Sequence, residues 1–367
     1  MPRSSSRVKI NEKITVASLA AATTLAVLPG CSKGGEMDGV RAPEIVVQSE
    51  GQWINSKPLS MKELEGKVVM IDIWDYTCVN CIRTLPYIKS WHERYADAGL
   101  VIIGVHAPEF EFAKTKENVQ DAVDRFDIKY PVVMDNEFKI WQSYANMYWP
   151  RKYLIDEKGY IRYDHVGEGG YTETEREIQK LLAGINPEVD FPEPLPDTSS
   201  RAAKGKACYP MTPELYMGYQ RGRIGNKEGY KPEKIVDYSE PDTLKDGFVY
   251  ARGAWYNRDE AMVHARETSE PEDYIGIHYH ALEVNAVIKP ETDKPYKVWV
   301  KHNDDWVREE DAGADIYFAS DGRTYLEITE PRMYRIINNS EYGNYELKLY
   351  STSEGFGIYA FTFGSCR

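Results

Sequence analysis

The stretch "KVVMIDIWDYTCVNCIRTLP", residues 67–86, decides the fold. Residues 67–74 have few polar breaks and are predicted to form a buried strand. Two cysteines, Cys78 and Cys81, follow this strand directly. Apolar residues then recur near helical spacing until Gly99 supplies a stop. The sequence therefore predicts a strand, a cysteine pair and a helix in immediate succession.

The Cys78/Cys81 pair could bind zinc, form a structural bridge or exchange electrons with other thiols. A zinc site needs further ligands, and none lies near in the sequence. A bridge across two residues closes a loop too small to constrain the unfolded chain much. At a helix N-terminus, unpaired amides and the helix dipole favour the thiolate of Cys78, and Cys81, one turn later, can resolve a mixed disulfide. Redox chemistry without a metal or a cofactor is therefore favoured.

Residues 1–31 have the form of an export signal. Basic residues precede the apolar run "TVASLAAATTLAVL", which is too short to cross a bilayer comfortably and ends in "LPGC" at Cys31. The ending "LPGC" resembles the lipobox of bacterial lipoproteins, in which the cysteine is lipidated and becomes the new N-terminus. A plain secretory signal is the alternative. We expect a protein held outside the cytoplasm on a bacterial membrane by a lipid on Cys31, with residues 32–42 as a tether.

The remaining chain divides by composition into two domains. With 28% charged and 42% hydrophobic residues it is globular, and a net charge of −13 excludes a nucleic-acid partner. Residues 43–185 alternate short apolar runs with helical periodicity, as in an α/β domain. Residues 186–207 are rich in proline and small polar residues and are predicted to be a linker. Residues 208–367 contain seven or eight strand-like runs, which predict an all-β jelly-roll sandwich.

These patterns also predict a turn, the start of a helix and the extent of a strand. The run 152–166 is predicted to be a hairpin that turns at residues 157–159. Thr174 and Glu177 have the spacing of a capping box, so the last helix of the α/β domain is expected to begin near Thr174. In the second domain the run "TYLEITEPRMYRIIN", residues 324–338, is predicted to be one strand.

The first domain resembles the thioredoxin-fold oxidoreductases of the TlpA/ResA kind, a branch of the redoxin proteins. The resemblance rests on "GKVVMIDIWDYTCVNC", on Pro86 inside the following helix and on "WPRKYLID" at residues 149–156. It implies that Cys78 is the nucleophile and Cys81 the resolving cysteine. It also implies that Pro150 follows a cis peptide bond that faces this pair and helps to hold the substrate backbone.

Four further side chains are candidates for the site. Trp149 and Trp74, which adjoin these motifs, are predicted to contact substrate with Pro150. Asp72 stands in an otherwise apolar strand, where burial should raise its pKa and suit it to accept the Cys81 proton. A satisfied core aspartate is the alternative. Glu109 matches the glutamate near the active site of ResA-like proteins, although a surface loop acid is equally consistent with its position.

Pieces of both domains, among them "HAPEF", "GEGGY" and "TPELYMG", resemble the exported C-terminal half of DipZ-type proteins. In those proteins a thioredoxin-like domain precedes a domain resembling carbohydrate-binding modules. The resemblance implies exported client proteins with disulfides and a membrane electron donor of the CcdA/DsbD type. DipZ-type chains carry their own CcdA-related membrane domain, whereas a lipobox-like signal takes its place here. The donor is therefore expected to be another protein, and the direction of electron flow stays open.

Cys208 and Cys366 stand near the two ends of the second domain. Exported cysteines normally pair, and the first and last strands of a jelly roll commonly lie side by side. We therefore predict a structural disulfide between them. His278 and His280 share a strand face, but without a third ligand no metal site is predicted.

Two other functions remain open at this stage. A peroxiredoxin-like peroxidase would carry threonine three residues before the reactive cysteine, where this chain has Asp75. The second domain could instead bind a glycan, with Trp299 or Trp306 stacked on sugar rings, and the redox pair would then be secondary. Reduction of client disulfides is the leading hypothesis.

Overall fold

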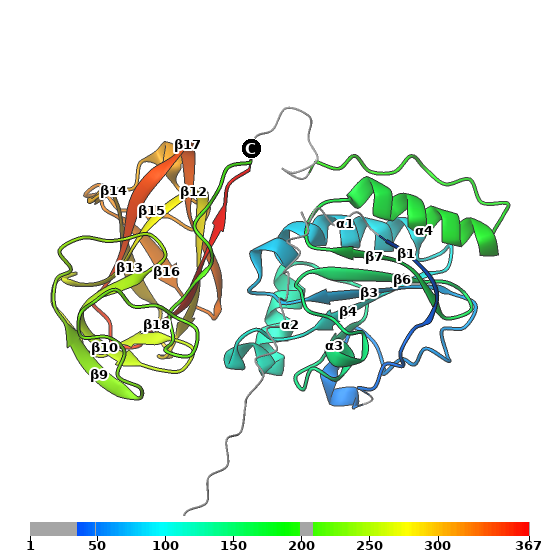
Figure 1. Ribbon diagram of the computed structural model, residues 1–367, viewed down its shortest axis with the longest axis horizontal. Coiled ribbons are helices and arrows are strands. Elements are labelled where there is room, and N and C mark those ends of the chain that lie inside the picture. Colours follow the sequence, from blue (N-terminus) through cyan, green and yellow to red (C-terminus); the bar gives the residue numbers. More distant parts are fainter. Residues whose placement is uncertain (1–34, 48, 199–207, 367) are drawn as a thin grey trace, which may run out of the picture. The chain divides into compact units, whose positions relative to one another are not determined.

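The computed structural model describes residues 35–47, 49–198 and 208–366. The first of its two sheets has seven strands in the order β1-β7-β6-β3-β4-β5-β2 (Figure 1). The strands are β1 (Gly35–Arg41), β2 (Trp53–Ile54), β3 (Val68–Trp74), β4 (Leu100–His106), β5 (Val132–Met134), β6 (Arg151–Ile155) and β7 (Tyr160–Val166). The helices are α1 (Val79–Tyr95), α2 (Lys116–Arg125), α3 (Lys139–Ser143) and α4 (Tyr171–Ile185), with short 3₁₀ turns η1 (Glu50–Gln52) and η2 (Glu111–Lys114). This is the predicted thioredoxin fold.

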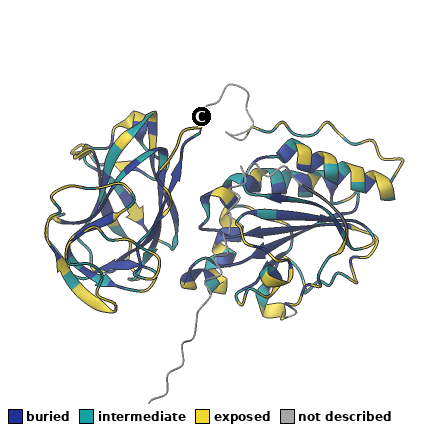
Figure 2. Ribbon diagram, viewed as in Figure 1, coloured by how far each residue is buried: buried dark blue, intermediate teal, exposed yellow. Residues whose placement is uncertain are grey.

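Strand β3 is the centre of this sheet. It runs parallel to β4 and antiparallel to β6, and all seven of its residues are buried (Figure 2). Successive side chains of a strand point to opposite faces. Val69, Ile71 and Ile73 accordingly pack in one core cluster with Ile140 of α3. Val68, Met70 and Trp74 pack in another cluster with residues of α1, α2 and α4. Asp72 alternates with this second set, so it faces the layer that contains α1.

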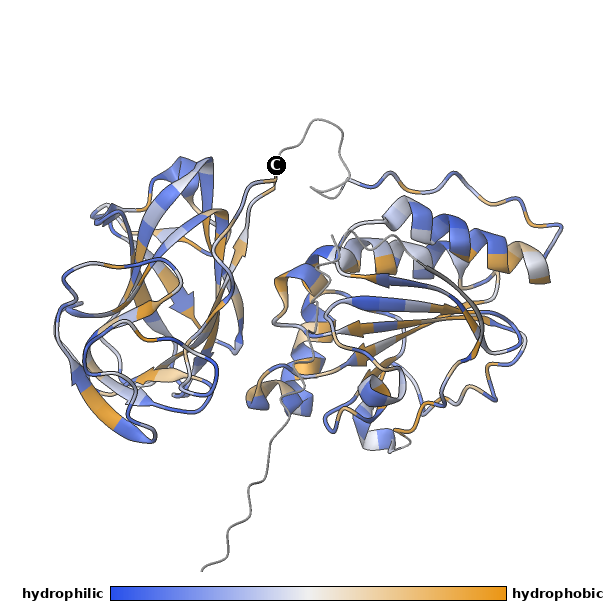
Figure 3. Ribbon diagram, in the orientation of Figure 1, coloured by the Kyte–Doolittle hydropathy of each residue, from blue (hydrophilic) through white to orange (hydrophobic). Residues whose placement is uncertain are grey.

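The second sheet is antiparallel and forms the predicted β-sandwich. Its strands are β8 (Leu215–Tyr216), β9 (Lys234–Tyr238), β10 (Val249–Asn257), β11 (Met262–His264), β12 (Asp273–Pro290), β13 (Tyr296–His302), β14 (Asp305–Trp306), β15 (Tyr317–Phe318), β16 (Thr324–Ile328), β17 (Arg332–Ser351) and β18 (Phe356–Gly364), with a 3₁₀ turn η3 (Glu309–Asp311). The register of the long β12–β17 pair shifts near Leu282 and again after Val284. Such bulges bend a strand. Beyond the first shift, β12 pairs with β18 as well as with β17, whereas its first half pairs with β10. The interior of the sandwich is apolar (Figure 3).

Three predicted boundaries differ from the structure. Residues 324–338 are two strands, because Pro331 lies between β16 and β17 and has no amide hydrogen to give to a ladder. Helix α4 begins at Tyr171, with Gly170 as its N-cap residue, and Thr174 lies inside it. Within the predicted tether, residues 35–41 form β1, which pairs with β7. Pairing at a sheet edge uses main-chain groups, so it left no side-chain pattern to recognise. The predicted export signal and Cys31 lie outside the described residues.

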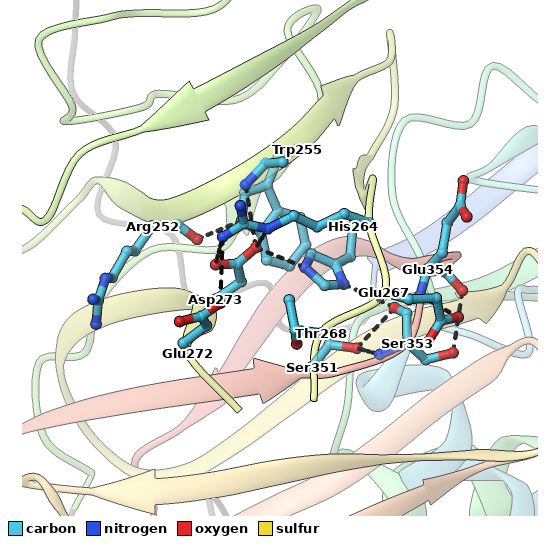
Figure 4. Close-up of polar contacts among 12 residues, drawn as sticks. Arg252, Trp255, His264, Glu267, Thr268, Glu272, Asp273, Ser351, Ser353 and Glu354 are labelled. Atoms are coloured by element: carbon cyan, nitrogen blue, oxygen red, sulfur yellow. Dashed lines mark hydrogen bonds and ion pairs between the residues drawn. The ribbon is translucent and has the colours of Figure 1, made fainter. Parts of the chain in front are cut away.

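A charge network around the buried Asp273 holds the start of β12 (Figure 4). Asp273 accepts two hydrogen bonds from Arg266, at 2.7 and 2.6 Å, and lies 3.0 Å from His264 Nε2. Gly253 has a φ of +84°, and a Cβ there would lie 2.0 Å from the Asp273 carboxyl carbon. Glycine is therefore required at this position, and the network serves the sandwich itself.

The described residues form a single compact unit, and specific contacts join the two sheets' domains. The Tyr359 ring of β18 lies 4.8 Å from the Phe112 ring of η2, edge to face. Arg125 of α2 forms an ion pair with Glu330 at 2.6 Å. The second domain can therefore contribute side chains to a site in the first. Among the described residues, no helix combines the length and the apolar character needed to cross a membrane.

Candidate active site

Cys78 and Cys81 occupy the first turn of α1. Cys78 is the N-cap residue, and its Sγ accepts a hydrogen bond from the Cys81 backbone N–H at 3.4 Å. Cys78 is partly exposed, whereas Cys81 is fully buried. Burial raises the pKa of the Cys81 thiol, and the adjacent Cys78 sulfur raises it further. The pair thus has one accessible sulfur and one protected sulfur that needs a base before it can react.

Asp72 is a candidate for that base. It is fully buried, and neither carboxyl oxygen accepts a hydrogen bond from the described residues. Burial raises its pKa to about 6, although the positive charge of Lys152 opposes the rise. Lys152 faces Asp72 across the β3–β6 pair and is itself fully buried, which lowers its pKa. The negative charges of Asp72 and Cys81 both favour the protonated form of Lys152 and so oppose the lowering of its pKa. The three groups therefore share one buried electrostatic environment.

Asp75 organises the loop before the cysteines. One of its carboxyl oxygens accepts hydrogen bonds from the Thr77 N–H and hydroxyl, each at 2.6 Å, and the other accepts the Glu109 N–H at 2.7 Å. The Cys78 N–H donates to the Asp75 carbonyl at 3.3 Å. His106, stacked on Tyr76, is fully buried, and burial lowers its pKa to about 3, so it is neutral. Asp75 therefore ties the cysteine turn to the segment that carries Glu109.

The Trp149–Pro150 peptide bond is cis, as the resemblance implied. The Trp149 indole N–H donates to the Ala107 carbonyl at 3.0 Å, and its ring lines the same cavity as Cys78. Trp74 differs from its prediction. It is fully buried and packs edge to face against His106, because it belongs to the inward set of β3. Trp74 is therefore a core residue, and it does not line this cavity.

Side chains of the second domain contact Glu109. Glu109 Oε1 accepts hydrogen bonds from the Tyr216 hydroxyl and from Arg221 Nη2, both at 2.9 Å. The Arg221 guanidinium also lies 3.4 Å from the centre of the Tyr216 ring. Burial and the Asp75 charge raise the pKa of Glu109, while Arg221 and Tyr216 oppose the rise. Glu109 is therefore a half-buried acid with partners from β8 and the loop after it.

A second carboxylate extends this group. Glu214 Oε2 lies 2.8 Å from the Tyr216 hydroxyl, and although Glu214 is exposed, the protein packed around its carboxyl and the charge of Glu109 raise the pKa of Glu214 to about 7. A phenol has one hydrogen and can donate to only one carboxylate at a time. A protonated Glu214 can donate to the Tyr216 oxygen while Tyr216 donates to Glu109. The Tyr216 hydroxyl thus links the carboxylates of Glu214 and Glu109 through hydrogen bonds.

These groups meet around one cavity of about 1010 Å³. Its lining includes Cys78, Trp149, Glu109 and the Glu214–Tyr216–Arg221 group. Arg83 of α1 also lines it and forms ion pairs with Glu168, at 3.1 Å, and with Glu283 of β12. The cavity therefore gives access to the partly exposed sulfur of Cys78.

Several of these residues could not be found from the sequence. Glu214 and Tyr216 lie in the quoted piece "TPELYMG" and Arg221 follows it, but all three are more than a hundred positions from Glu109, so only the three-dimensional contact shows that they share its site. Lys152 stood inside the quoted "WPRKYLID", and its burial opposite Asp72 could have been inferred from strand pairing. Among the described residues, no cluster of His, Cys, Asp or Glu has the arrangement of a metal site.

Comparisons with known proteins match both domains. Residues 37–182 match the Redoxin family, and residues 212–364 match a family described as a thioredoxin like C-terminal domain. Protein DipZ of Mycobacterium tuberculosis is 38% identical over 248 residues, which are 64% of this chain and 33% of DipZ. The chain thus spans about a third of the length of that relative.

A second relative is covered over most of its length. The thiol-disulfide oxidoreductase ResA of Bacillus cereus is 31% identical over 143 residues, which are 39% of this chain and 78% of ResA. The match covers the domain in which the partly exposed Cys78 caps α1 and Cys81 lies buried behind it. The chain belongs to the family of thioredoxin-fold thiol-disulfide oxidoreductases that includes ResA.

Proposed function

We propose that this chain reduces disulfide bonds of exported client proteins through Cys78 and Cys81. The observation that carries the proposal is the asymmetry of the pair, with an accessible sulfur at the N-cap of α1 and a fully buried sulfur behind it. An unpaired helix N-terminus stabilises a thiolate, which is the nucleophile in disulfide exchange. The cavity beside Cys78, the tryptophan that lines it and the cis peptide bond that follows this tryptophan support binding of an extended client segment.

The reaction proceeds in two exchanges. The Cys78 thiolate attacks one sulfur of the client disulfide, forms a mixed disulfide and releases the other client sulfur as a thiolate. Cys81 then gives its proton to Asp72 and attacks Cys78, which releases the second client thiolate and leaves a Cys78–Cys81 disulfide. Glu109, joined to Glu214 through Tyr216, supplies protons to the released client thiolates. Two electrons pass to the client, and an external donor must restore the dithiol.

We also retain the proposed location and partners. The signal-like residues 1–31 and the resemblance to exported oxidoreductases support a lipid-anchored protein outside the cytoplasm, with a donor of the CcdA/DsbD type. The resemblance of the sandwich to carbohydrate-binding modules supports a glycan ligand for that domain. Fractionation of cells that carry Cys31→Ser tests the anchor, since the variant should leave the membrane fraction.

The wild-type protein tests the proposed reaction directly. The pre-reduced chain should reduce insulin, with one insulin disulfide lost for each Cys78–Cys81 disulfide formed, as measured by alkylation and mass spectrometry. Hydrogen peroxide is the contrasting oxidant. If it is consumed faster than insulin disulfides at equal concentration, the chain is a peroxidase and the proposal is wrong.

Tyr216→Phe should alter the pH profile of insulin reduction. The substitution removes a hydrogen-bond donor that lowers the pKa of Glu109, so this pKa should rise further and Glu109 should ionise at higher pH. We expect a two- to fivefold loss of rate at pH 7, about the worth of one hydrogen bond, and an upward shift of the alkaline limb of the profile, because Glu109 acts as the proton donor. Tyr209→Phe is the matched control, because Tyr209 lines the same cavity but stacks on Tyr342. Equal profiles for both variants would contradict the role of Tyr216.

A further inference from the structure

A disulfide of the second domain lies on the same cavity as Cys78. Cys208 and Cys366 are bonded to each other, and both line this cavity together with Cys78. We propose that the Cys208–Cys366 disulfide is a second redox centre, which exchanges electrons with the Cys78/Cys81 pair inside one molecule. The inference rests on the proposed function of that pair and gives the second domain a part in the electron path.

The carboxyl end of β18 brings this disulfide toward the active-site helix. Gly364 is the last residue of β18, and a Cβ on it would lie 2.9 Å from Nη2 of Arg83. Arg83 stands two residues after Cys81, and Cys366 stands two residues after Gly364. Arg83 also forms an ion pair with Glu283, which is the register partner of Gly364 in β12. The contact between α1 and this strand end is therefore specific, and the absence of a side chain at Gly364 permits it.

The disulfide is accessible to attack. Cys208 is exposed and Cys366 is half-buried, whereas Cys81 is fully buried. Neither cysteine of the bridge belongs to the apolar core of the sandwich. Exposed disulfides are the labile ones in proteins, and those that only stabilise a fold are more resistant to reduction. An incoming thiolate can thus reach Cys208 from the cavity.

Opening the bridge would leave the strands around it paired. Leu215 and Tyr216 of β8 pair with Phe361 and Ala360 of β18. The Tyr209 N–H donates to the Ser365 carbonyl at 3.1 Å. These backbone contacts hold both ends of the domain without the covalent bond. The sandwich can therefore stay folded in the reduced form, as a cycling redox centre requires.

The exchange balances without another reagent. The Cys78 thiolate attacks Cys208, so the Cys208–Cys366 bond breaks, a Cys78–Cys208 bond forms, and Cys366 leaves as a thiolate that takes up a proton. Cys81 then loses its proton and attacks Cys78, and Cys208 leaves as a thiolate. Two electrons and one proton have moved from one pair of cysteines to the other, because Cys78 starts and Cys208 ends as a thiolate. The chain can in this way store four reducing electrons, two in each dithiol.

The first test is capture of the intermediate in the full-length chain. In Cys81→Ser the first exchange can occur but the second cannot. Acid quenching, alkylation and mass spectrometry of unreduced peptides should show Cys78 joined to Cys208 or Cys366 within a monomer. Cys81→Ala serves as a second variant in case serine disturbs the buried position. Complete alkylation of Cys78 in both variants, with Cys208 and Cys366 still bonded to each other, overturns the proposal.

The second test measures the rate at which the bridge is reduced. At limiting dithiothreitol, the Cys208–Cys366 bond should open at least tenfold faster in the wild type than in Cys78→Ser, because the wild type offers an intramolecular route. Equal rates overturn the proposal. Insulin reduction by the wild type is followed in parallel. If insulin is reduced but the bridge opens at the Cys78→Ser rate, only the relay fails. If the bridge opens through Cys78 but insulin is untouched, the relay stands and the proposed client reaction fails.

Discussion

Replacing Asp72 by asparagine is expected to raise the free energy of unfolding by about 3 kcal/mol at pH 8. The Asp72 carboxyl is fully buried without a hydrogen-bond donor among the described residues, and burial raises its pKa from 3.8 to about 6. A shift of this size costs the folded protein about 1.4 kcal/mol per pKa unit once the group is ionised in both states. Asparagine has nearly the same shape and no charge, so it removes this cost.

The stabilisation should depend on pH with a definite sign. A carboxyl whose pKa is raised by folding favours the folded state at low pH, and this contribution is lost as the pH rises through the folded pKa. The difference between Asp72→Asn and the wild type should therefore be small at pH 4, grow up to about pH 6 and stay constant above pH 7. Urea unfolding at pH 4.5 and pH 8 measures it. A difference that is equal at both values would contradict the buried, ionisable state of Asp72.

Asp156→Asn is the matched control for this experiment. Asp156 is also buried, but it accepts hydrogen bonds from the Tyr160 N–H and from Arg162, and the pKa of Asp156 is lowered because these contacts outweigh its burial. Its contribution to stability is present above the unfolded pKa and is lost as the pH falls. The control should therefore be less stable than the wild type at pH 8, opposite in sign to Asp72→Asn.

The same substitution should slow catalysis while it stabilises the fold. Asp72→Asn removes the base proposed for the Cys81 thiol, whose pKa is itself raised by burial. General-base contributions are typically 10²-fold or more, so resolution of the mixed disulfide should slow by about 10²-fold at pH 7. The wild-type rate of resolution should rise with an apparent pKa near 6, and the variant should lack this inflection. Rapid-quench measurement of the mixed disulfide at several pH values checks both expectations.

The fold of the first domain could be predicted because short stretches of sequence specify its main elements. The apolar run of β3, the cysteine pair and the distant Trp149–Pro150 motif each specify one element, and the structure contains all three. The predicted start of α4, near Thr174, was wrong for an equally local reason. Gly170 occupies the N-cap position with a φ of +63°, and the apparent capping box lies one turn inside the helix.

The rest of the site depends on contacts that no local pattern encodes. Tyr216 is an ordinary strand tyrosine until the second domain places its hydroxyl against Glu109. The Cys208–Cys366 pairing was predicted from the position of the two cysteines, but nothing in the sequence placed that bridge beside Cys78. Side chains that act across a domain contact can be assigned only once the contact is seen.

Replacing Cys78 by serine is expected to reduce the rate of insulin reduction by about 10³-fold or more. A serine hydroxyl is not ionised near neutral pH and is a poor nucleophile for sulfur. The second sulfur cannot substitute for the first, because Cys81 is fully buried in the first turn of α1 and burial raises the pKa of its thiol. The measurement is insulin turnover with reductant in excess, at equal protein concentration.

Cys81→Ser is the informative counterpart, since the two sulfurs are inequivalent. It should lose turnover as well, yet still hold its Cys78 sulfur in one trapped disulfide per molecule, either with insulin or with a cysteine of the Cys208–Cys366 bridge, because the partly exposed nucleophile is intact. Cys78→Ser should form none. If both variants formed mixed disulfides equally, either sulfur could attack, and the assignment of nucleophile and resolving cysteine would be wrong. The burial difference between two sulfurs one helical turn apart thus predicts opposite intermediates from the same conservative change.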